Sequence, residues 1–80
     1  MEIRSFTLSI IVCNRFGVLM RVVNLFSKRG YNIDSLHVDT LIKDEAFSRI
    51  IMTSKGDDAT KTQIVKQLLK LYDVKEVKII

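Results

Sequence analysis

The chain has 80 residues, of which 48% are hydrophobic and 28% are charged, a balance typical of one globular domain rather than a disordered chain. Its net charge of +4 comes from basic residues scattered between apolar positions, as expected of solvated helix faces. A nucleic-acid surface stays open as an alternative because the charge is positive. No apolar run approaches the roughly 20 residues of a membrane span. The N-terminus also lacks the features of a signal peptide, so we predict a cytoplasmic protein that does not associate with membranes.

The first half of the chain predicts a strand over about 3–13, a helix over about 18–29 and a strand over about 32–42. In the first strand, apolar side chains share one face. In the helix they recur at helical spacing and stop at Gly30, which suits the left-handed residue that ends a helix. The alternation in the second strand slips near Ser35, which predicts a β-bulge there.

The second half predicts a hairpin, a helix and a last strand. A polar turn at 43–45 leads into a strand over about 46–54. Thr60 and Gln63 have the spacing of a capping box, which predicts a helix from Thr60 to about Tyr72. A strand over 74–80 follows. The order βαββαβ predicts an α+β, ferredoxin-like fold for a single domain over residues 1–80, with two helices on one face of a four-stranded antiparallel sheet.

Two further sets of residues bear on partners and chemistry. Apolar side chains on the sheet face that two helices cannot cover predict a partner there, although singly exposed apolar residues are the alternative; they are Ile11, Phe47 and Ile51. Cys13 is the single cysteine, so it cannot form an internal disulfide or a Cys-x-x-Cys metal site. Such a small domain buries only about 60% of its unfolded surface, so an oligomeric interface would stabilise it.

The turn between the first strand and the first helix is the candidate site. It consists of Arg15, Phe16 and Gly17, directly after Asn14. A helix N-terminus offers free backbone N–H groups to a small anion such as a carboxylate. No nucleophile, acid–base pair or metal cluster accompanies the turn. The pattern therefore favours a sensor that binds a small acid over an enzyme that transforms one.

Nearly the whole chain resembles an ACT domain, and within that family it is most similar to the small regulatory subunit of acetolactate synthase, also called acetohydroxyacid synthase. The run from Phe26 to Leu36, FSKRGYNIDSL, is the most specific part of the likeness. Further matching motifs include Asn14-x-x-Gly17-Val18-Leu19, Phe47-Ser48-Arg49 and Asp73-Val74-x-x-Val77.

The resemblance implies a regulatory site for a branched-chain amino acid, usually valine, at the interface of an ACT homodimer. The effector carboxylate would meet backbone N–H groups of Gly17, Val18 and Leu19, and Asn14 would bind its polar end. The partner copy would close the pocket with two further residues, Asn32 and Ile33. A structural interpretation is available for some of these residues: Asn14 would cap the helix, Gly17 would permit the turn and Asn32 would bond its own backbone.

The resemblance also implies a partner, the catalytic large subunit, which carries thiamine diphosphate, FAD and magnesium. This chain would bind no cofactor and would act by shifting the population of an active form of that subunit. Two positions depart from the family pattern. Met20 stands where a small residue is usual, and Phe16 stands where proline or a small polar residue is usual. Both bear on which amino acid the site accepts.

Other functions of the same fold are weaker matches. An acylphosphatase-like enzyme would need a glycine-richer loop, and a metal chaperone would need a second cysteine. An RNA-binding domain would need aromatic clusters on its central strands, which Phe6 and Phe47 do not supply. We therefore predict no nucleic-acid partner. The remaining alternative is an ACT amino-acid sensor that regulates a different enzyme.

Overall fold

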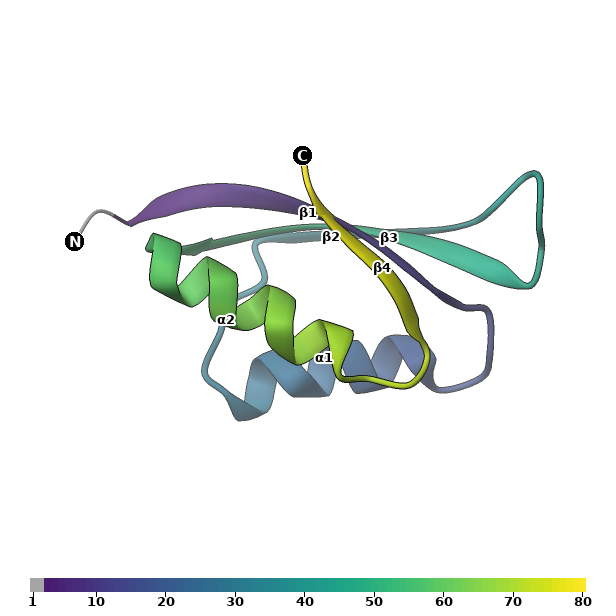
Figure 1. Cartoon of the computed structure of the whole chain (residues 1–80), viewed down its shortest axis with the longest axis horizontal. Coiled ribbons are helices and arrows are strands. Elements are labelled where there is room, and N and C mark those ends of the chain that lie inside the picture. Colours follow the sequence, from purple (N-terminus) through teal and green to yellow (C-terminus); the bar gives the residue numbers. More distant parts are fainter. Residues whose placement is uncertain (1–2) are drawn as a thin grey trace.

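A computed structural model describes residues 3–80 and contains the six predicted elements in the predicted order. These are β1 (Arg4–Cys13), α1 (Val18–Lys28), β2 (Ser35–Thr40), β3 (Phe47–Gly56), α2 (Asp58–Leu69) and β4 (Val74–Ile79). The strands form one antiparallel sheet in the order β2-β3-β1-β4. Both helices lie on the same side of this sheet (Figure 1). The predicted ferredoxin-like fold is therefore confirmed.

The core lies between the sheet and the helices. The strand residues that face the helices, such as Leu8, Ile10 and Ile50, have no exposed surface. Helix α1 contributes Val18, Val22 and Phe26, four residues apart, and α2 contributes Ile64 and Leu68 with the same spacing. This spacing puts each set on one helix face, and burial of that face stabilises the fold by about 25 cal/mol for each Å² of apolar surface.

The end of α1 is built as the sequence predicts. Gly30 has φ 73°, in the left-handed region. The N–H of Gly30 donates to the carbonyl of Ser27, and the N–H of Tyr31 donates to the carbonyl of Phe26. The rings of Tyr31 and Phe26 meet edge to face, with centroids 5.6 Å apart. Together these contacts form a Schellman motif with its hydrophobic contact, which holds the chain as it leaves the helix.

The start of α2 differs from the prediction. The helix begins at Asp58, and the cap is Asp57, whose carboxylate accepts the N–H of Thr60 at 2.8 Å. This hydrogen bond holds the pKa of the Asp57 carboxyl below its ordinary value of 3.8. The capping-box interpretation of Thr60 is wrong because β3 continues to Gly56 and leaves Asp57 as the connecting residue. The predicted end at Tyr72 is also wrong: beyond Leu69 the chain continues in tight turns.

Strand β2 is shorter than predicted and contains no bulge. Its register with β3 runs without a break from Ser35, opposite Thr53, to Thr40, opposite Ser48. The irregularity in the sheet lies instead between β1 and β4, where the register shifts between Ile11 and Val12. At that shift Lys75 is the extra residue, since Ile11 faces Glu76 and Val12 faces Val74. An extra residue of this kind bends and twists its strand.

The hairpin between β2 and β3 is confirmed. Asp44 closes its turn, because its carboxylate accepts the N–H of Ala46 and its carbonyl accepts the N–H of Phe47. The N–H of Leu41 donates to the carbonyl of Phe47, so pairing continues past the end of β2. The hairpin extends beyond the helices at the side of the molecule where β1 joins α1 (Figure 1).

Candidate functional site

The candidate site is the loop of residues 14–17 between β1 and α1. The loop is fixed at its start, because the N–H of Asn14 donates to the carbonyl of Ala46 at 2.7 Å. It ends at Gly17, which has φ 87° and ψ −8° and precedes the first residue of α1. An L-residue with a side chain rarely adopts this left-handed conformation, so the turn favours glycine at this position.

The N-terminus of α1 carries no negative charge of its own. No side chain within residues 3–80 caps it, and its first turn contains no acidic residue. Helix α2, by contrast, has the Asp57 cap and Asp58 in its first turn. The positive end of the α1 dipole is therefore uncompensated by a capping carboxylate, an arrangement that favours an external anion.

Three backbone N–H groups at this helix start have no hydrogen-bond partner within residues 3–80, those of Gly17, Leu19 and Met20. The N–H of Val18 donates to the carbonyl of Arg15 at 3.3 Å and thereby closes the turn. The side chain of Val18 is buried in the core, whereas Leu19 is partly exposed. Of the three amides predicted to meet a carboxylate, Gly17 and Leu19 are thus unpaired, and Val18 is engaged.

Asn14 does not cap α1, so the structural interpretation of this residue is wrong. Its side-chain N–H₂ donates to the carbonyl of Glu45 at 3.0 Å, which ties the loop to the hairpin turn. Its Oδ1 makes no hydrogen bond to another described residue, and Asn14 as a residue is exposed. That oxygen is oriented by a fixed amide and is available to accept a hydrogen bond from an ammonium group.

Asn32 and Ile33 lie at the opposite end of α1. The 11 residues of α1 span about 16 Å at 1.5 Å per residue, so one chain does not bring these residues to the loop. The amide of Asn32 donates to the carboxylate of Asp34, and its carbonyl accepts the hydroxyl of Ser54. Ile33 packs against the core. A pocket that includes both ends of α1 would need a second copy of the chain.

Phe16 and Met20 both face solvent. The side chain of Phe16 is fully exposed and that of Met20 is 57% exposed. Neither residue fills the loop from within the chain, so the two departures from the family pattern leave the backbone amides accessible. Their apolar surface beside the loop is free to contact a ligand or a second copy.

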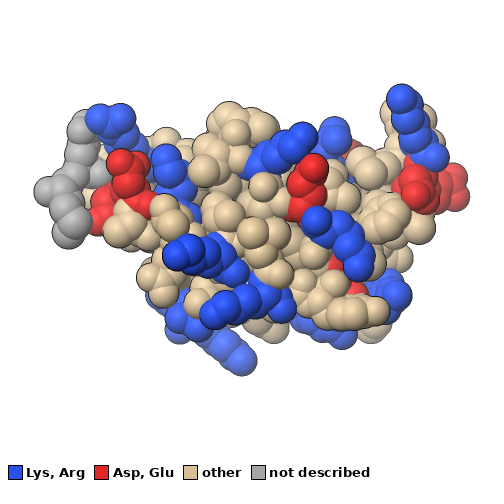
Figure 2. Space-filling model, in the orientation of Figure 1, with Lys and Arg blue, Asp and Glu red and all other residues tan. Residues whose placement is uncertain are grey.

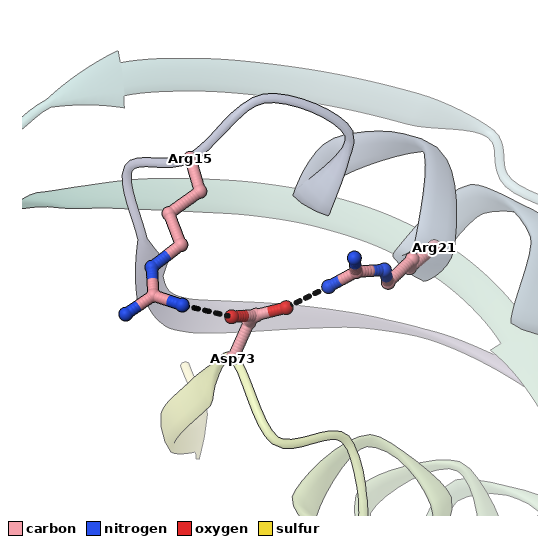
Figure 3. Close-up of polar contacts among 3 residues, drawn as sticks. All are labelled: Arg15, Arg21 and Asp73. Carbon is pink, nitrogen blue, oxygen red and sulfur yellow. Dashed lines mark hydrogen bonds and ion pairs between the residues drawn. The ribbon is translucent and has the colours of Figure 1, made fainter.

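Sequence reasoning gave no role to Asp73 and counted the basic residues of the helices, Arg21 among them, as solvated charge. The structure brings both together with Arg15 next to the loop (Figure 3). Asp73 is 3% exposed, and its carboxylate lies between the two guanidinium groups. A lone acidic residue between apolar neighbours at a helix–strand junction was the signal, because acids are seldom fully buried unless they are paired.

Basic side chains are spread over the face shown in Figure 2, with acidic side chains between them. Residues 3–80 contain no cluster of three His, Cys, Asp or Glu side chains arranged to hold a metal ion. None of the helices in this range is both long and apolar enough to cross a membrane.

Comparison with known proteins gives matches over most of the chain. Residues 8–76 match the family described as AHAS small subunit-like ACT domain, AHAS being acetohydroxyacid synthase. The probable acetolactate synthase small subunit of Archaeoglobus fulgidus is 44% identical over 71 residues, which are 89% of this chain and 44% of that protein. The acetolactate synthase isozyme 3 small subunit of Escherichia coli is 47% identical over 70 residues, 88% of this chain and 42% of that protein.

A solved structure supports the same assignment. The acetolactate synthase small subunit of Thermotoga maritima has a TM-score of 0.88 at 41% identity, over 95% of this chain and 47% of that one. The fold and the open loop before α1 thus define a ferredoxin-like ACT domain. The chain belongs to the family of AHAS small subunit-like ACT domains. It spans less than half the length of these three relatives.

Proposed function

We propose that this chain is a regulatory ACT unit of acetolactate synthase that binds a branched-chain amino acid, valine above all, and modulates the catalytic large subunit. The observation that carries the proposal is the uncapped start of α1, with unpaired N–H groups at Gly17 and Leu19. The chain's membership of the AHAS small subunit-like family supports an amino acid as the ligand of that anion site and the catalytic large subunit as its partner.

In this proposal the ligand carboxylate accepts hydrogen bonds from the free N–H groups of Gly17 and Leu19. The ammonium group of the ligand donates a hydrogen bond to Oδ1 of Asn14. Each charge-assisted hydrogen bond contributes about 1.5–3 kcal/mol, and the helix dipole adds about 0.3–1 kcal/mol. Two such bonds with a buried isopropyl group correspond to an affinity on the order of micromolar to millimolar. That range suits feedback sensing of a metabolite.

A second copy of the chain completes the site. The loop side chains are open to solvent, and Asn32 and Ile33 lie about 16 Å away along α1. In a two-fold dimer with α1 helices antiparallel, the loop of one copy lies beside the residues after α1 in the other. Each dimer then has two equivalent sites.

The regulated reaction belongs to the partner. The catalytic subunit would carry thiamine diphosphate, FAD and magnesium in the cytoplasm, and this chain would contribute none of the chemistry. The amino acid would bias the equilibrium between forms of the complex by about 1–3 kcal/mol.

Calorimetric titration tests the proposal. Valine, isoleucine and leucine are titrated into the purified chain, with Gly17→Asp as the comparison variant because a carboxylate there would repel the ligand carboxylate. We expect saturable valine binding that Gly17→Asp abolishes. Equal binding by both proteins would place the site elsewhere, and no binding by the wild-type chain would refute an effector site in the isolated domain.

Co-purification tests the partner. The tagged chain is co-expressed with a thiamine-dependent acetolactate synthase large subunit, and activity is measured with and without valine. We expect a complex whose activity changes with valine. A chain that binds valine but neither co-purifies with the large subunit nor alters its activity would instead be an ACT sensor for another enzyme.

A further inference from the structure

Asp73 is a buried carboxylate in the connection between α2 and β4, outside the candidate site. Only 4% of its side chain is exposed, although both arginines beside it are more than 60% exposed. Apolar residues border it, and one of them, Val74, begins the buried end of β4. A charge held in such surroundings is stabilised by its partners, so the identity of those partners indicates its role.

The contacts of Asp73 surround the loop of residues 14–17. One carboxylate oxygen accepts a hydrogen bond from the Arg21 guanidinium, and the other lies 3.9 Å from Nη1 of Arg15 (Figure 3). The backbone carbonyl of Asp73 accepts the N–H of Cys13 at 2.8 Å. Cys13 precedes the loop, Arg15 lies within it and Arg21 follows it on the first turns of α1. Asp73 thus contacts the chain just before the loop, within the loop and just after it.

The loop has few other attachments. Asn14 ties its start to the hairpin, and the Val18 N–H closes it on Arg15. In the part of the chain that the structure describes, no side chain caps the helix that follows. Arg15 lies in this loop and Arg21 follows it in α1. The contacts of Asp73 with both arginines therefore restrain the segment that carries the Gly17 and Leu19 amides.

We propose that Asp73 is a positioning residue for the amino-acid site: through its two arginines it fixes the loop amides in the orientation that receives a carboxylate, without touching the ligand. A loop ordered before binding loses less entropy when the ligand arrives, so affinity depends on the clamp. This inference rests on the proposed amino-acid site before α1.

The test compares Asp73→Asn with Asp57→Ala. Asparagine keeps the shape of Asp73 and removes its charge, whereas Asp57 caps the other end of α2 through the N–H of Thr60, away from the loop of residues 14–17. Amide hydrogen exchange of the ligand-free chain is measured by NMR, followed by valine titration. For Asp73→Asn we expect faster exchange at Val18 and valine binding about tenfold weaker, as loss of preorganisation predicts. For Asp57→Ala we expect lower stability with unchanged Val18 exchange and valine affinity.

Two outcomes would overturn the inference. One is wild-type exchange and affinity in Asp73→Asn. The other is an equal loss of affinity in Asp57→Ala, because any destabilised chain would then bind poorly. If Asp73→Asn does not fold, Arg21→Gln on the exposed side of the clamp takes its place, and wild-type loop exchange in that variant would also overturn it. The exchange measurement needs no ligand, so failure of the wild-type chain to bind valine refutes the proposed function and leaves the positioning role to be decided by exchange alone.

Discussion

Replacing Gly17 with alanine isolates the backbone strain of the loop. Gly17 has φ 87°, and a Cβ built there would meet no atom within 4 Å, so the substitution adds strain without a clash. The left-handed conformation costs an L-residue about 1–2 kcal/mol, and the lower entropy of the unfolded alanine chain offsets about 0.4–1 kcal/mol. The net loss of stability is about 1 kcal/mol, or about 4–8 °C in Tm for a domain of this size.

Gly30→Ala and Gly17→Asn are the matched controls. Gly30 has φ 73° and equally open surroundings, so Gly30→Ala should cost the same as Gly17→Ala. Asparagine tolerates the left-handed region, so Gly17→Asn should cost less. Thermal unfolding followed by circular dichroism measures all three variants. Wild-type stability in Gly17→Ala, or an equal loss in Gly17→Asn, would refute the assignment of the effect to backbone strain.

Three further predictions concern the packing of α2 and its cap. Leu68→Ala should lower the free energy of unfolding by about 2–5 kcal/mol because Leu68 is fully buried, whereas Leu69→Ala, at a half-exposed position, should change it by about 0.5 kcal/mol or less in denaturant titration. Similar losses in both would mean that α2 packs through another face. Asp57 has a lowered pKa in the folded chain because it accepts the Thr60 N–H, so its stabilising contribution is complete above 3.8 and is lost as pH falls through the lowered pKa. Asp57→Ala should therefore weaken the dependence of stability on pH in that acidic range, and an unchanged dependence would contradict the cap. Gly56→Ala would bring a Cβ within 2.8 Å of Cγ2 of Thr60, which should destabilise the domain by about 1–3 kcal/mol. Thr60→Gly removes the side-chain atoms that would meet the new Cβ. If the losses of stability of Gly56→Ala and Thr60→Gly simply add in the double variant, the clash is excluded.

The sequence predicted the order and type of every element, and in α1 and β1 the apolar pattern is also the pattern of burial. The α1 residues Val22 and Phe26, and Leu8 and Ile10 of β1, are buried on the predicted faces. Gly30 was recognised as a helix end because its left-handed conformation is local chemistry. Apolar spacing and a glycine at a helix end depend on residues that are close in sequence, so the sequence alone is enough to predict them.

The errors occurred where distant contacts decide the outcome. Thr60 has the spacing of a cap, but the length of β3 makes Asp57 the connecting residue. The alternation at Ser35 suggested a bulge, yet the shift lies between β1 and β4 and is visible only when the strands are paired.

The candidate site was predictable only in part for the same reason. The loop before α1 is contiguous in sequence, so its residues were found together. The buried partner of Arg21, by contrast, lies 52 residues away in the chain, and no local spacing connects the two.

The extra residue Lys75 in the β1–β4 pairing has a consequence for assembly. Strand β4 is an edge of the sheet, and it carries this irregularity together with the exposed lysines Lys75 and Lys78. Lysines and bulges make an edge strand a poor template for another strand. The opposite edge, β2, has neither a lysine nor a break in its register. A sheet that can be extended along one edge alone stops growing after two copies join through that edge, so the fold favours a closed pair over an open-ended fibre.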